Sequence, residues 1–399
     1  MNGRVLVVNC GSSSLKYRLV DVAAGEALAW GLAERVGQPS GRLTHTLPGR
    51  PPAVVEQPLP DHGRALAAAL AAFDRDGPRL ADAGLVAVAH RVVHGGDRFS
   101  APVRVDDGVL RAIRELAMLA PLHNPVNAVG IEVARRAFPG LPHVAVFDTA
   151  FHATLPPAAS TYAVPPQWAR EHGVRRYGFH GTSHAFVSRA AAGLLGRPVE
   201  EVNTVVLHLG NGASAAAVAG GRSVDTSMGM TPLEGLVMGT RSGDVDPAVV
   251  AHLHRVAGLG PEEVDRALNS SSGMLALAGT NDLREVHRRI AEGDTAAALA
   301  LDVFCHRVRK YVGAYLAVLG RTDAIAFTGG IGENDAVVRS RSLAGLAPLG
   351  VRLDEERNAA RTDGARRVSA EGSPVAVLVV PTDEELEMAR QAVDLLDGH

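Results

Sequence analysis

Two arginines lie among small residues, where an anionic substrate can reach the guanidinium group. Arg91 belongs to the segment 90–96 (HRVVHGG), and Arg241 belongs to the segment 238–244 (MGTRSGD). The guanidinium group presents parallel N–H donors that match the two oxygens of a carboxylate or phosphate. Because a single surface arginine usually forms only a solvated salt bridge, these residues indicate an anion site only together with other motifs.

Three glycine-rich turns can bring backbone N–H groups close to a phosphate. They are the segments 9–14 (NCGSSS), 210–214 (GNGAS) and 328–334 (TGGIGEN). The second has the spacing of a dinucleotide fingerprint, but that motif opens a helix and a strand-like run follows here, so a β-turn facing a phosphate fits better. A plain hairpin turn stays open for each of the first two, and an ordinary strand-to-helix turn for the third. The sequence contains no Walker A motif.

Acidic residues near the C-terminus have both a structural and a functional interpretation. The segment 382–385 (TDEE) predicts a capping box in which Thr382 is the N-cap and Glu385 reaches back to it. Glu384 has no part in that box. An acid at the end of a buried strand is a candidate Mg²⁺ ligand, although the segment taken alone favours capping.

The histidines include two pairs at i, i+4 spacing, 90/94 and 180/184. Such pairs bind zinc when they lie on a helix, but residues 85–93 read as a strand and no further zinc motif accompanies either pair. A metal-dependent hydrolase is therefore not favoured. His180 is expected in a loop next to a helix start, where it can steady a transferring phosphoryl group.

These motifs lie in a repeated order of elements. Residues 4–8 and 15–21 read as strands around the first turn, and residues 204–209 and 215–219 read as strands around the second. We interpret this shared layout, half a chain apart, as an internal duplication.

Further strands and helices alternate along the chain, which indicates an α/β fold. Strands are expected at 85–89, 144–147, 324–327 and 375–380, and helices at 107–120, 126–137, 184–195, 247–256, 262–269, 282–292, 295–319 and 383–397. Residues 37–63 are expected to form a hairpin or a surface excursion. Polar residues follow the strands, so we expect a ligand site at the carboxyl ends of the sheet strands.

The composition excludes several classes of protein. The 399 residues are 46% hydrophobic and 21% charged with a net charge of −3, so the chain lacks the basic excess of nucleic-acid-binding proteins. Two cysteines cannot form a disulfide scaffold, and no apolar run approaches the length of about 20 residues that spans a membrane. With no secretory signal pattern, we expect a cytoplasmic protein that binds neither nucleic acid nor membrane.

The motifs taken together resemble the acetokinase (acetate kinase) family of the sugar-kinase/Hsp70/actin superfamily. The resemblance rests on the segments 7–16, 90–96, 120–125, 146–152, 177–184, 208–214, 224–247 and 328–334, which occur in the family's order and spacing. It implies two duplicated actin-like (ribonuclease H-like) domains with an interdomain cleft. It further implies reversible transfer of the ATP γ-phosphoryl group to acetate, giving acetyl phosphate and ADP, with Mg²⁺ (or Mn²⁺), in a homodimer.

The resemblance also implies that the two domains bind different substrates. Residues 1–150 with 385–399 would form the N-terminal lobe on the acetate and magnesium side, closed by the C-terminal helix. Residues 151–384 would form the second lobe, which binds the nucleotide and holds the dimer interface.

The resemblance implies a role for each matching residue. Arg91 would hold the acetate carboxylate, Asp148 would be the catalytic carboxylate, and His180 and Arg241 would stabilise the transition state. The pocket for the acetate methyl group would consist of Val93, Leu122, Phe179 and Pro232. The ATP phosphates would contact Lys16, His208, Leu209, Gly210, Asn211 and Gly212. The adenosine would contact Asp282, Leu283, Arg284, Gly330, Ile331, Gly332, Glu333 and Asn334, and Mg²⁺ would bind Asn9 and Glu384.

One departure and two alternatives accompany this interpretation. The family usually has Asn where this chain has Asp383, and the added charge beside Glu384 is expected to tune Mg²⁺ affinity.

A propionate or butyrate kinase of the same family differs only in pocket size, and Val93 with Phe179 favours acetate. An actin- or Hsp70-like nucleotide switch is a different class, but it leaves Arg91 and the apolar pocket without a purpose.

Overall fold

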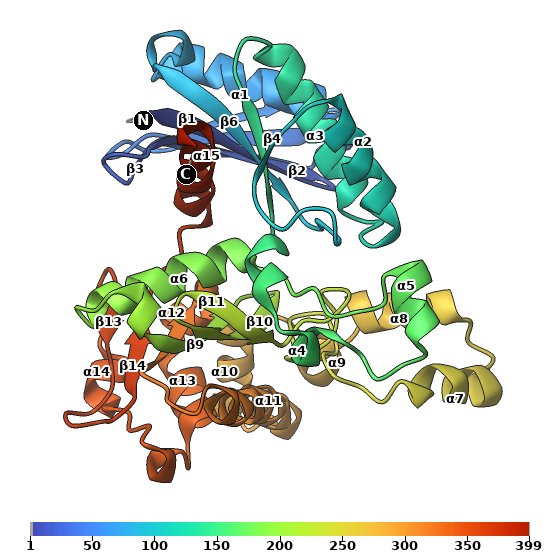
Figure 1. Cartoon of the computed structure of the whole chain (residues 1–399), viewed down its shortest axis with the longest axis vertical. Coiled ribbons are helices and arrows are strands. Elements are labelled where there is room, and N and C mark those ends of the chain that lie inside the picture. Colours follow the sequence, from blue (N-terminus) through green and yellow to red (C-terminus); the bar gives the residue numbers. More distant parts are fainter. Residues whose placement is uncertain (1–2, 399) are drawn as a thin grey trace. The chain divides into compact units, whose positions relative to one another are not determined.

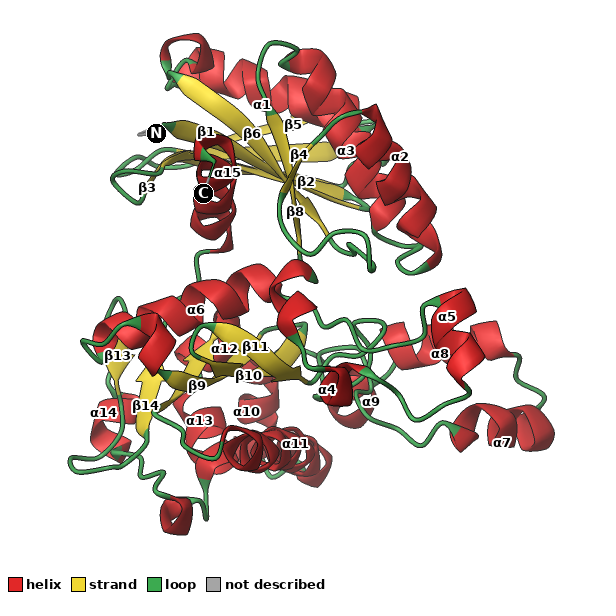
Figure 2. Ribbon diagram, viewed as in Figure 1, coloured by secondary structure: helices red, strands yellow, loops and turns green. Residues whose placement is uncertain are grey.

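The computed structural model describes residues 3–398, and the chain divides into two compact units (Figure 1). Unit 1 comprises the residues up to 151 and those from 383 onward, and unit 2 comprises residues 152–382. Each unit is built around its own β-sheet with helices packed against it (Figure 2). The α/β class that the alternating pattern predicts is therefore confirmed.

The sheet of unit 1 has eight strands in the order β5-β4-β3-β2-β1-β6-β8-β7 over the described residues. Strands β1 to β5 form an antiparallel series, whereas β1, β6 and β8 run parallel. The strands are β1 (Arg4–Gly11), β2 (Ser14–Asp21), β3 (Glu26–Glu34), β4 (Gly41–Thr46), β5 (Ala53–Gln57), β6 (Leu85–Val92), β7 (Val103–Arg104) and β8 (His143–Phe147).

Helices pack against the sheet of unit 1 from two sides. Helices α1 (His62–Asp76), α2 (Asp107–Glu115) and α3 (Asn124–Ala137) bury one face, where Leu6, Val8 and Tyr17 contribute to the core beside α1. Helix α15 (Glu384–Asp397) packs against β1 and β6. Since side chains alternate along a strand, the residues between the α1-facing ones point toward the side of α15.

Unit 2 repeats the central part of this topology. Its sheet has the order β11-β10-β9-β12-β14-β13, in which β9 to β11 are antiparallel and β9, β12 and β14 are parallel. The series β3-β2-β1-β6-β8 of unit 1 thus matches β11-β10-β9-β12-β14, which confirms the internal duplication. The strands are β9 (Asn203–Leu209), β10 (Ala213–Ala219), β11 (Arg222–Thr226), β12 (Ala324–Thr328), β13 (Arg366–Arg367) and β14 (Ala376–Val379).

The helices of unit 2 include the long α11 (Thr295–Leu319), which packs on β10 and β9, and α6 (Gly181–Leu194), which packs on β9 and β12. The others are α4 (Pro157–Ser160), α5 (Pro166–His172), α7 (Ala248–Ala257), α8 (Pro261–Ser270), α9 (Gly273–Ala278), α10 (Leu283–Ala291), α12 (Gly329–Asn334), α13 (Ala336–Leu343) and α14 (Glu355–Ala359). Short 3₁₀ turns occupy 80–82, 116–118, 150–154, 199–201 and 347–349.

Most expected elements occur close to their expected bounds, and the differences have local causes. The segment 37–63 contributes the hairpin β4–β5 to the sheet, as expected. The run 329–334 is not a bare turn but the short helix α12, in which the Glu333 side chain accepts the Gly329 N–H at 2.9 Å. The predicted capping box is wrong by one residue, because Asp383 rather than Thr382 is the N-cap of α15.

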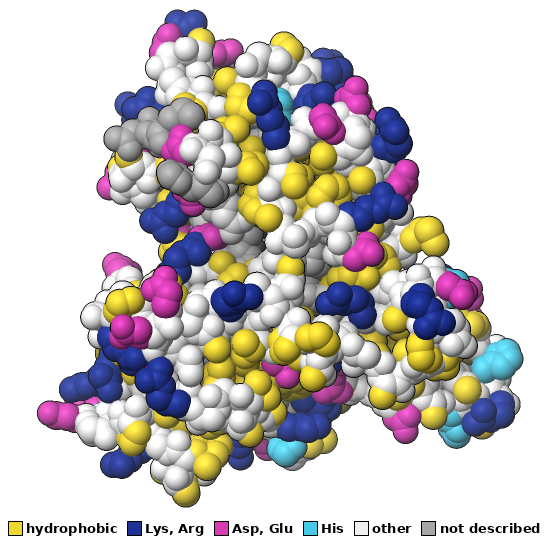
Figure 3. Space-filling view, viewed as in Figure 1, with side chains coloured by type: hydrophobic (Ala, Val, Ile, Leu, Met, Phe, Trp, Pro, Cys, Tyr) yellow, Lys and Arg dark blue, Asp and Glu magenta, His cyan; other side chains and the backbone are white. Residues whose placement is uncertain are grey.

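The surface mixes charges of both signs. On the face shown in Figure 3, basic and acidic side chains lie interspersed over each unit. Within residues 3–398, no helix combines the length and the apolar character that crossing a lipid bilayer demands.

Candidate active site

Unit 1 contains a buried pair of opposite charges at the carboxyl ends of two parallel strands. Arg91 lies near the end of β6, and Asp148 directly follows β8. The guanidinium Nε donates to Asp148 Oδ1 at 2.9 Å and Nη2 donates to Oδ2 at 2.7 Å. The Asp148 carboxylate is almost fully buried, whereas a quarter of the Arg91 side chain is accessible. Asp148 therefore holds the arginine from the inside and leaves its outer edge open.

The geometry of this pair leaves a second pair of donors on Arg91. The contact with Asp148 uses Nε and one N–H of Nη2, and the remaining N–H groups lie on Nη1 and on the outer side of Nη2. These groups form a fork that suits another carboxylate. The negative charge of Asp148 raises the pKa of Arg91, with a smaller contribution from Glu384, so the guanidinium stays charged. Burial raises the pKa of Asp148, and Arg91 opposes that rise.

Other predicted residues of unit 1 share the sheet face of Arg91. Asn9 and Lys16 stand opposite each other in the β1–β2 ladder, and Asn9 lies between Val8 and Cys10, which face α1. Asn9 and Lys16 therefore point toward the α15 side. Glu384 is the first residue of α15, and its charge acts on Arg91. The sheet thus brings Asn9, Lys16 and Arg91 to the face against which the helix carrying Glu384 packs.

The N-terminus of α15 is tied to strand β2 by Asp383. Its carboxylate accepts the Leu386 backbone N–H at 2.9 Å and the Arg18 guanidinium at 2.8 Å. Glu385 approaches the same arginine at 3.6 Å. Arg18 therefore neutralises the charge that Asp383 adds beside Glu384, which explains how this chain accommodates an acid there.

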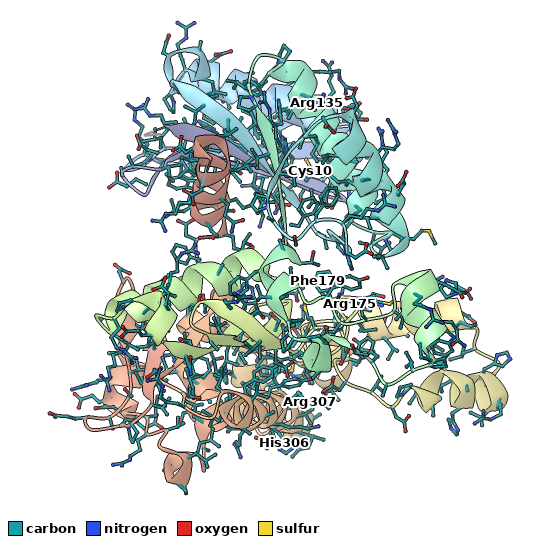
Figure 4. The ribbon with its side chains drawn as sticks, viewed as in Figure 1. Cys10, Arg135, Arg175, Phe179, His306 and Arg307 are labelled. Carbon is teal, nitrogen blue, oxygen red and sulfur yellow. The ribbon has the colours of Figure 1, made fainter. Side chains whose placement is uncertain are left out.

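The predicted methyl pocket is divided between the units. In unit 1, Val93 is half-buried and its backbone N–H donates to Asn127, whereas Leu122 lies in an exposed turn with 72% of its surface accessible. In unit 2, Phe179 is buried directly before α6 (Figure 4), and the carbonyl of Pro232 accepts an N–H of Arg241 at 2.6 Å. Of these four residues, Pro232 contacts a predicted catalytic side chain, Arg241, and the complete pocket stays a prediction.

In unit 2, the turn between β9 and β10 lies against two predicted catalytic side chains. A Cβ atom on Gly212 would lie 3.3 Å from Arg241 Nη2 and 3.5 Å from His180 Nε2. A larger residue at this position would therefore fill the space beside both groups. Burial lowers the pKa of Arg241. The glycine leaves a small space beside one guanidinium nitrogen and one imidazole nitrogen, which is a suitable environment for phosphoryl oxygens.

His180 is held in an unusual backbone conformation. It is the N-cap of α6 with φ 56°, in the left-handed region that residues with a side chain rarely adopt. Its ring stacks on that of His208 at the end of β9, with ring centroids 4.4 Å apart. The expectation of a loop position next to a helix start is confirmed. The backbone strain is typical of residues whose orientation matters for function.

The residues expected around adenosine lie at the starts of two helices. Asp282 caps α10 and forms an ion pair with the largely exposed Arg284, while Leu283 is buried. In α12, Gly332 is buried and Asn334 donates to the Gly330 carbonyl at 2.9 Å, and Ile331 is half-buried. Glu333 binds backbone N–H groups of its own unit, including that of Thr382 at 3.3 Å. These contacts are structural, so adenosine binding here stays a prediction.

Sequence reasoning missed two serines that contact the histidines of unit 2. Ser214 bonds to both His180 and His184, and Ser183 bonds to His208 at 2.8 Å and to Thr382 at 2.9 Å. The i, i+4 spacing of His180 and His184 is thus explained by a shared serine. Only the alternation of β10, which turns Ser214 inward, could have indicated this.

The oxygen donors of unit 1 fit a hard divalent cation. The Asn9 amide oxygen and the Glu384 carboxylate are ligands that Mg²⁺ prefers. Both belong to elements that meet on one side of the sheet, as described above.

Comparison with known proteins places the chain in a family. Residues 4–390 match the model of the Acetokinase family. The chain is 62% identical to a protein named acetate kinase from Leifsonia xyli subsp. xyli, over 98% of both chains. It is 57% identical to an acetate kinase from Streptomyces avermitilis, over 98% of this chain and 97% of the relative.

Solved structures agree with this assignment. The acetate kinase of Porphyromonas gingivalis superposes with a TM-score of 0.94 at 41% identity, covering 99% of this chain and all of the other. A propionate kinase from Francisella tularensis superposes with a TM-score of 0.91 at 40% identity, covering 98% of each chain. The fold is thus that of the two-domain phosphotransferases to which these enzymes belong. The chain belongs to the acetokinase family.

Proposed function

We propose that this chain is an acetate kinase, which transfers the γ-phosphoryl group of ATP to acetate and yields acetyl phosphate and ADP. The observation that carries the proposal is the Arg91–Asp148 pair, because it leaves one donor fork open for a small carboxylate. The relatives at 56–62% identity are named acetate kinase, and the match covers nearly their whole length. The reaction is reversible, since acetyl phosphate is itself a phosphoryl donor.

Unit 1 positions the acceptor in this proposal. The open fork of Arg91 binds the acetate carboxylate, and Val93, two residues further along, contributes apolar surface for the methyl group. A carboxylate is already a nucleophile at neutral pH, so no general base is required. Asp148 fixes the orientation of the guanidinium, and its charge keeps Arg91 protonated. Most of the rate enhancement on this side comes from orientation.

Unit 2 stabilises the transferring group in this proposal. The space beside Gly212 receives the phosphoryl oxygens, where Arg241 and His180 donate hydrogen bonds. The charge that develops on these oxygens in the transition state is stabilised by donors that are already in place. Lys16 and the backbone of residues 208–212 contact the remaining phosphates, and residues 282–284 and 330–334 contact the adenosine.

A magnesium ion completes the proposed site. Asn9 and Glu384 would hold it, and Mn²⁺ would fit the same oxygen donors. When bound, the ion supplies positive charge that offsets the charge of the ATP phosphates. Arg18 and Asp383 hold the helix that carries Glu384.

The proposal extends to the assembly and location of the protein. The nucleotide and the dimer interface are assigned to residues 151–384, and the acetate and metal side to residues 1–150 with 385–399. We expect a homodimer, as the resemblance to the family implies. A cytoplasmic location is supported by the two unpaired, buried cysteines.

A propionate kinase is the second candidate function. It is supported by the likeness to the Francisella propionate kinase, which is nearly as close as the likeness to the Porphyromonas acetate kinase. One methylene group changes discrimination by only about 1–3 kcal/mol, so a modest change in pocket volume would change the preferred acid.

The test is an assay with ATP and Mg²⁺ that traps acyl phosphate with hydroxylamine. Acetate, propionate, butyrate and no acid are compared, and product is expected to be largest with acetate and to fall with chain length. A maximum with propionate would establish the second candidate. ADP release without trapped product would contradict both and indicate a nucleotide switch. Arg91→Ala should abolish product formation with every acid, and Arg98→Ala is its matched control, because Arg98 pairs with Glu115 on the exposed surface of the same unit.

A further inference from the structure

One serine hydroxyl lies between two histidine rings in unit 2. Ser214 Oγ is 2.9 Å from His180 Nδ1 and 2.8 Å from His184 Nε2. Ser214 and His184 are completely buried. Because no water reaches them, the protons in this group of three residues must be shared among the atoms that the structure shows.

His184 carries one ring proton, and its surroundings determine on which nitrogen that proton lies. Burial lowers its pKa well below the usual value, with His152 and His208 adding to the effect, so the ring is neutral and carries one proton. Its Nδ1 atom is buried and has no hydrogen-bond partner. A proton on Nδ1 would be a buried donor without an acceptor, which native proteins avoid. The proton therefore lies on Nε2, which donates to Ser214.

The state of Ser214 then determines the state of His180. The serine accepts one bond from His184 and has one proton of its own to donate. The hydroxyl donates that proton to His180 Nδ1, since otherwise it would be a buried donor without an acceptor. A neutral ring that accepts at Nδ1 carries its proton on Nε2, the atom beside Gly212.

We propose that His184 and Ser214 form a relay that fixes His180 as the neutral tautomer with its proton on Nε2. His180 then acts as a hydrogen-bond donor toward the space beside Gly212 and not as a proton acceptor. His184 and Ser214 are positioning residues, because they act through His180. The catalytic consequence rests on the proposed phosphoryl transfer, whereas the tautomer itself does not.

A second histidine–serine pair in unit 2, His152 with Ser223, provides a comparison for His180 with Ser214. His152 Nδ1 lies 2.7 Å from Ser223 Oγ, and His152 Nε2 lies 3.0 Å from the Phe179 carbonyl. Since a carbonyl only accepts, His152 must carry its proton on Nε2 whether or not Ser223 is present. For His180, the hydroxyl of Ser214 donates to Nδ1 and therefore requires the proton to lie on Nε2. Ser223→Ala is therefore a matched control for Ser214→Ala.

The experiment measures the tautomer directly. Long-range ¹H–¹⁵N correlation spectra of the full chain, labelled at its histidines, distinguish the protonated from the bare ring nitrogen. The His180 signals are assigned by their loss in His180→Asn. We expect an Nε2–H ring in the unsubstituted chain and in Ser223→Ala. In Ser214→Ala we expect the Nδ1–H form to appear, and in Ser214→Thr, which keeps the hydroxyl, we expect the Nε2–H form to return.

Kinetics provide the second readout. Ser214→Ala is expected to lower kcat about 10- to 100-fold, with the KM for acetate changed less than 3-fold, in line with the effect of lost orienting groups elsewhere. Ser223→Ala is expected to lower thermal stability without that loss of kcat. A His180 ring that carries its proton on Nδ1 in the unsubstituted chain, or keeps its Nε2–H form in Ser214→Ala, would overturn the relay. Absence of acyl phosphate formation would overturn the proposed function and leave the tautomer result intact.

Discussion

The two units share a sheet topology but use different chemistry at corresponding places. Each unit has a helix whose N-terminal end carries a candidate residue, Glu384 on α15 in unit 1 and His180 on α6 in unit 2. The positive end of a helix dipole favours the carboxylate of Glu384 and disfavours a positively charged ring at His180. Unit 1 thus has an arginine held by a buried carboxylate, Arg91 with Asp148, whereas unit 2 has the Arg241 guanidinium and the His180 ring beside an open glycine turn.

One architecture thus serves two tasks in the proposed reaction. A small carboxylate needs a rigid, charged fork, and a buried counter-ion holds such a fork in place. A phosphoryl group needs hydrogen-bond donors that stabilise the charge developing on its oxygens in the transition state. Duplication supplied the same scaffold twice, and different side chains at the strand ends adapted each copy.

The largest effect is expected from Arg91→Ala in unit 1. The substitution leaves Asp148 buried without a partner, and losing one member of a buried ion pair costs about 3–5 kcal/mol. Acetate binding should be lost at the same time. Chemical denaturation measures the stability, and acyl phosphate assays at high acetate measure the activity. An unfolding free energy equal to that of Arg98→Ala would contradict the structural role of the pair.

The same variant should show a pH dependence with a definite sign. Burial raises the pKa of Asp148, and the variant lacks the arginine that opposes this rise. Asp148 of the folded variant then binds a proton more tightly than it does in the unfolded chain, so the unfavourable contribution of Asp148 to stability decreases as the pH falls. The deficit relative to the unsubstituted chain should be largest at pH 7 and shrink toward pH 4, near the ordinary carboxyl pKa. A deficit that is constant with pH would show that the lost charge pair is not its cause.

An intermediate effect is expected from Arg241→Ala in unit 2. Among residues 3–398, Arg241 forms no ion pair with a carboxylate and donates to the Pro232 carbonyl, so its loss leaves no buried opposite charge. We expect kcat to fall about 10²- to 10³-fold with unfolding free energy nearly unchanged, because a transition-state donor is removed. Comparing kcat with the KM for acetate separates this role from that of Arg91. If both parameters change equally in both variants, the division between the units is wrong.

The smallest effects are expected at the start of α15. Asp383→Ala removes the N-cap and the pair with Arg18 and should destabilise the chain by about 1–2 kcal/mol. Asp383→Asn keeps a capping side chain, so it should cost less than about 1 kcal/mol. Thr382→Ala is the control for capping, because Thr382 bonds to Ser183 instead. A higher Mg²⁺ requirement in Asp383→Ala than in Asp383→Asn would show that the cap positions Glu384.

Local pattern was sufficient to predict many elements. The strands around the turns at 9–14 and 210–214, the long helix at 295–319 and the position of His180 before a helix all follow from residue types and periodicity. The capping-box prediction was wrong because Thr, Asp and Glu are all common at a helix start. The Asp383 carboxylate that caps the helix also binds Arg18 in a strand distant in sequence, a contact that no local pattern reports. The short helix α12 was missed because its glycines are typical of turns.

Composition, periodicity and motif order by themselves determined the duplicated α/β plan, the family, and the arginine, glycine and acidic residues that could do chemistry. Only the tertiary structure decided which of these residues meet. Arg91 and Asp148 are paired because β6 and β8 are parallel neighbours. Ser214 of β10 lies between His180 and His184 because β10 and α6 are both neighbours of β9. Sequence patterns report the local backbone state, whereas the contacts that set charge and tautomer depend on strand register and helix packing between distant segments.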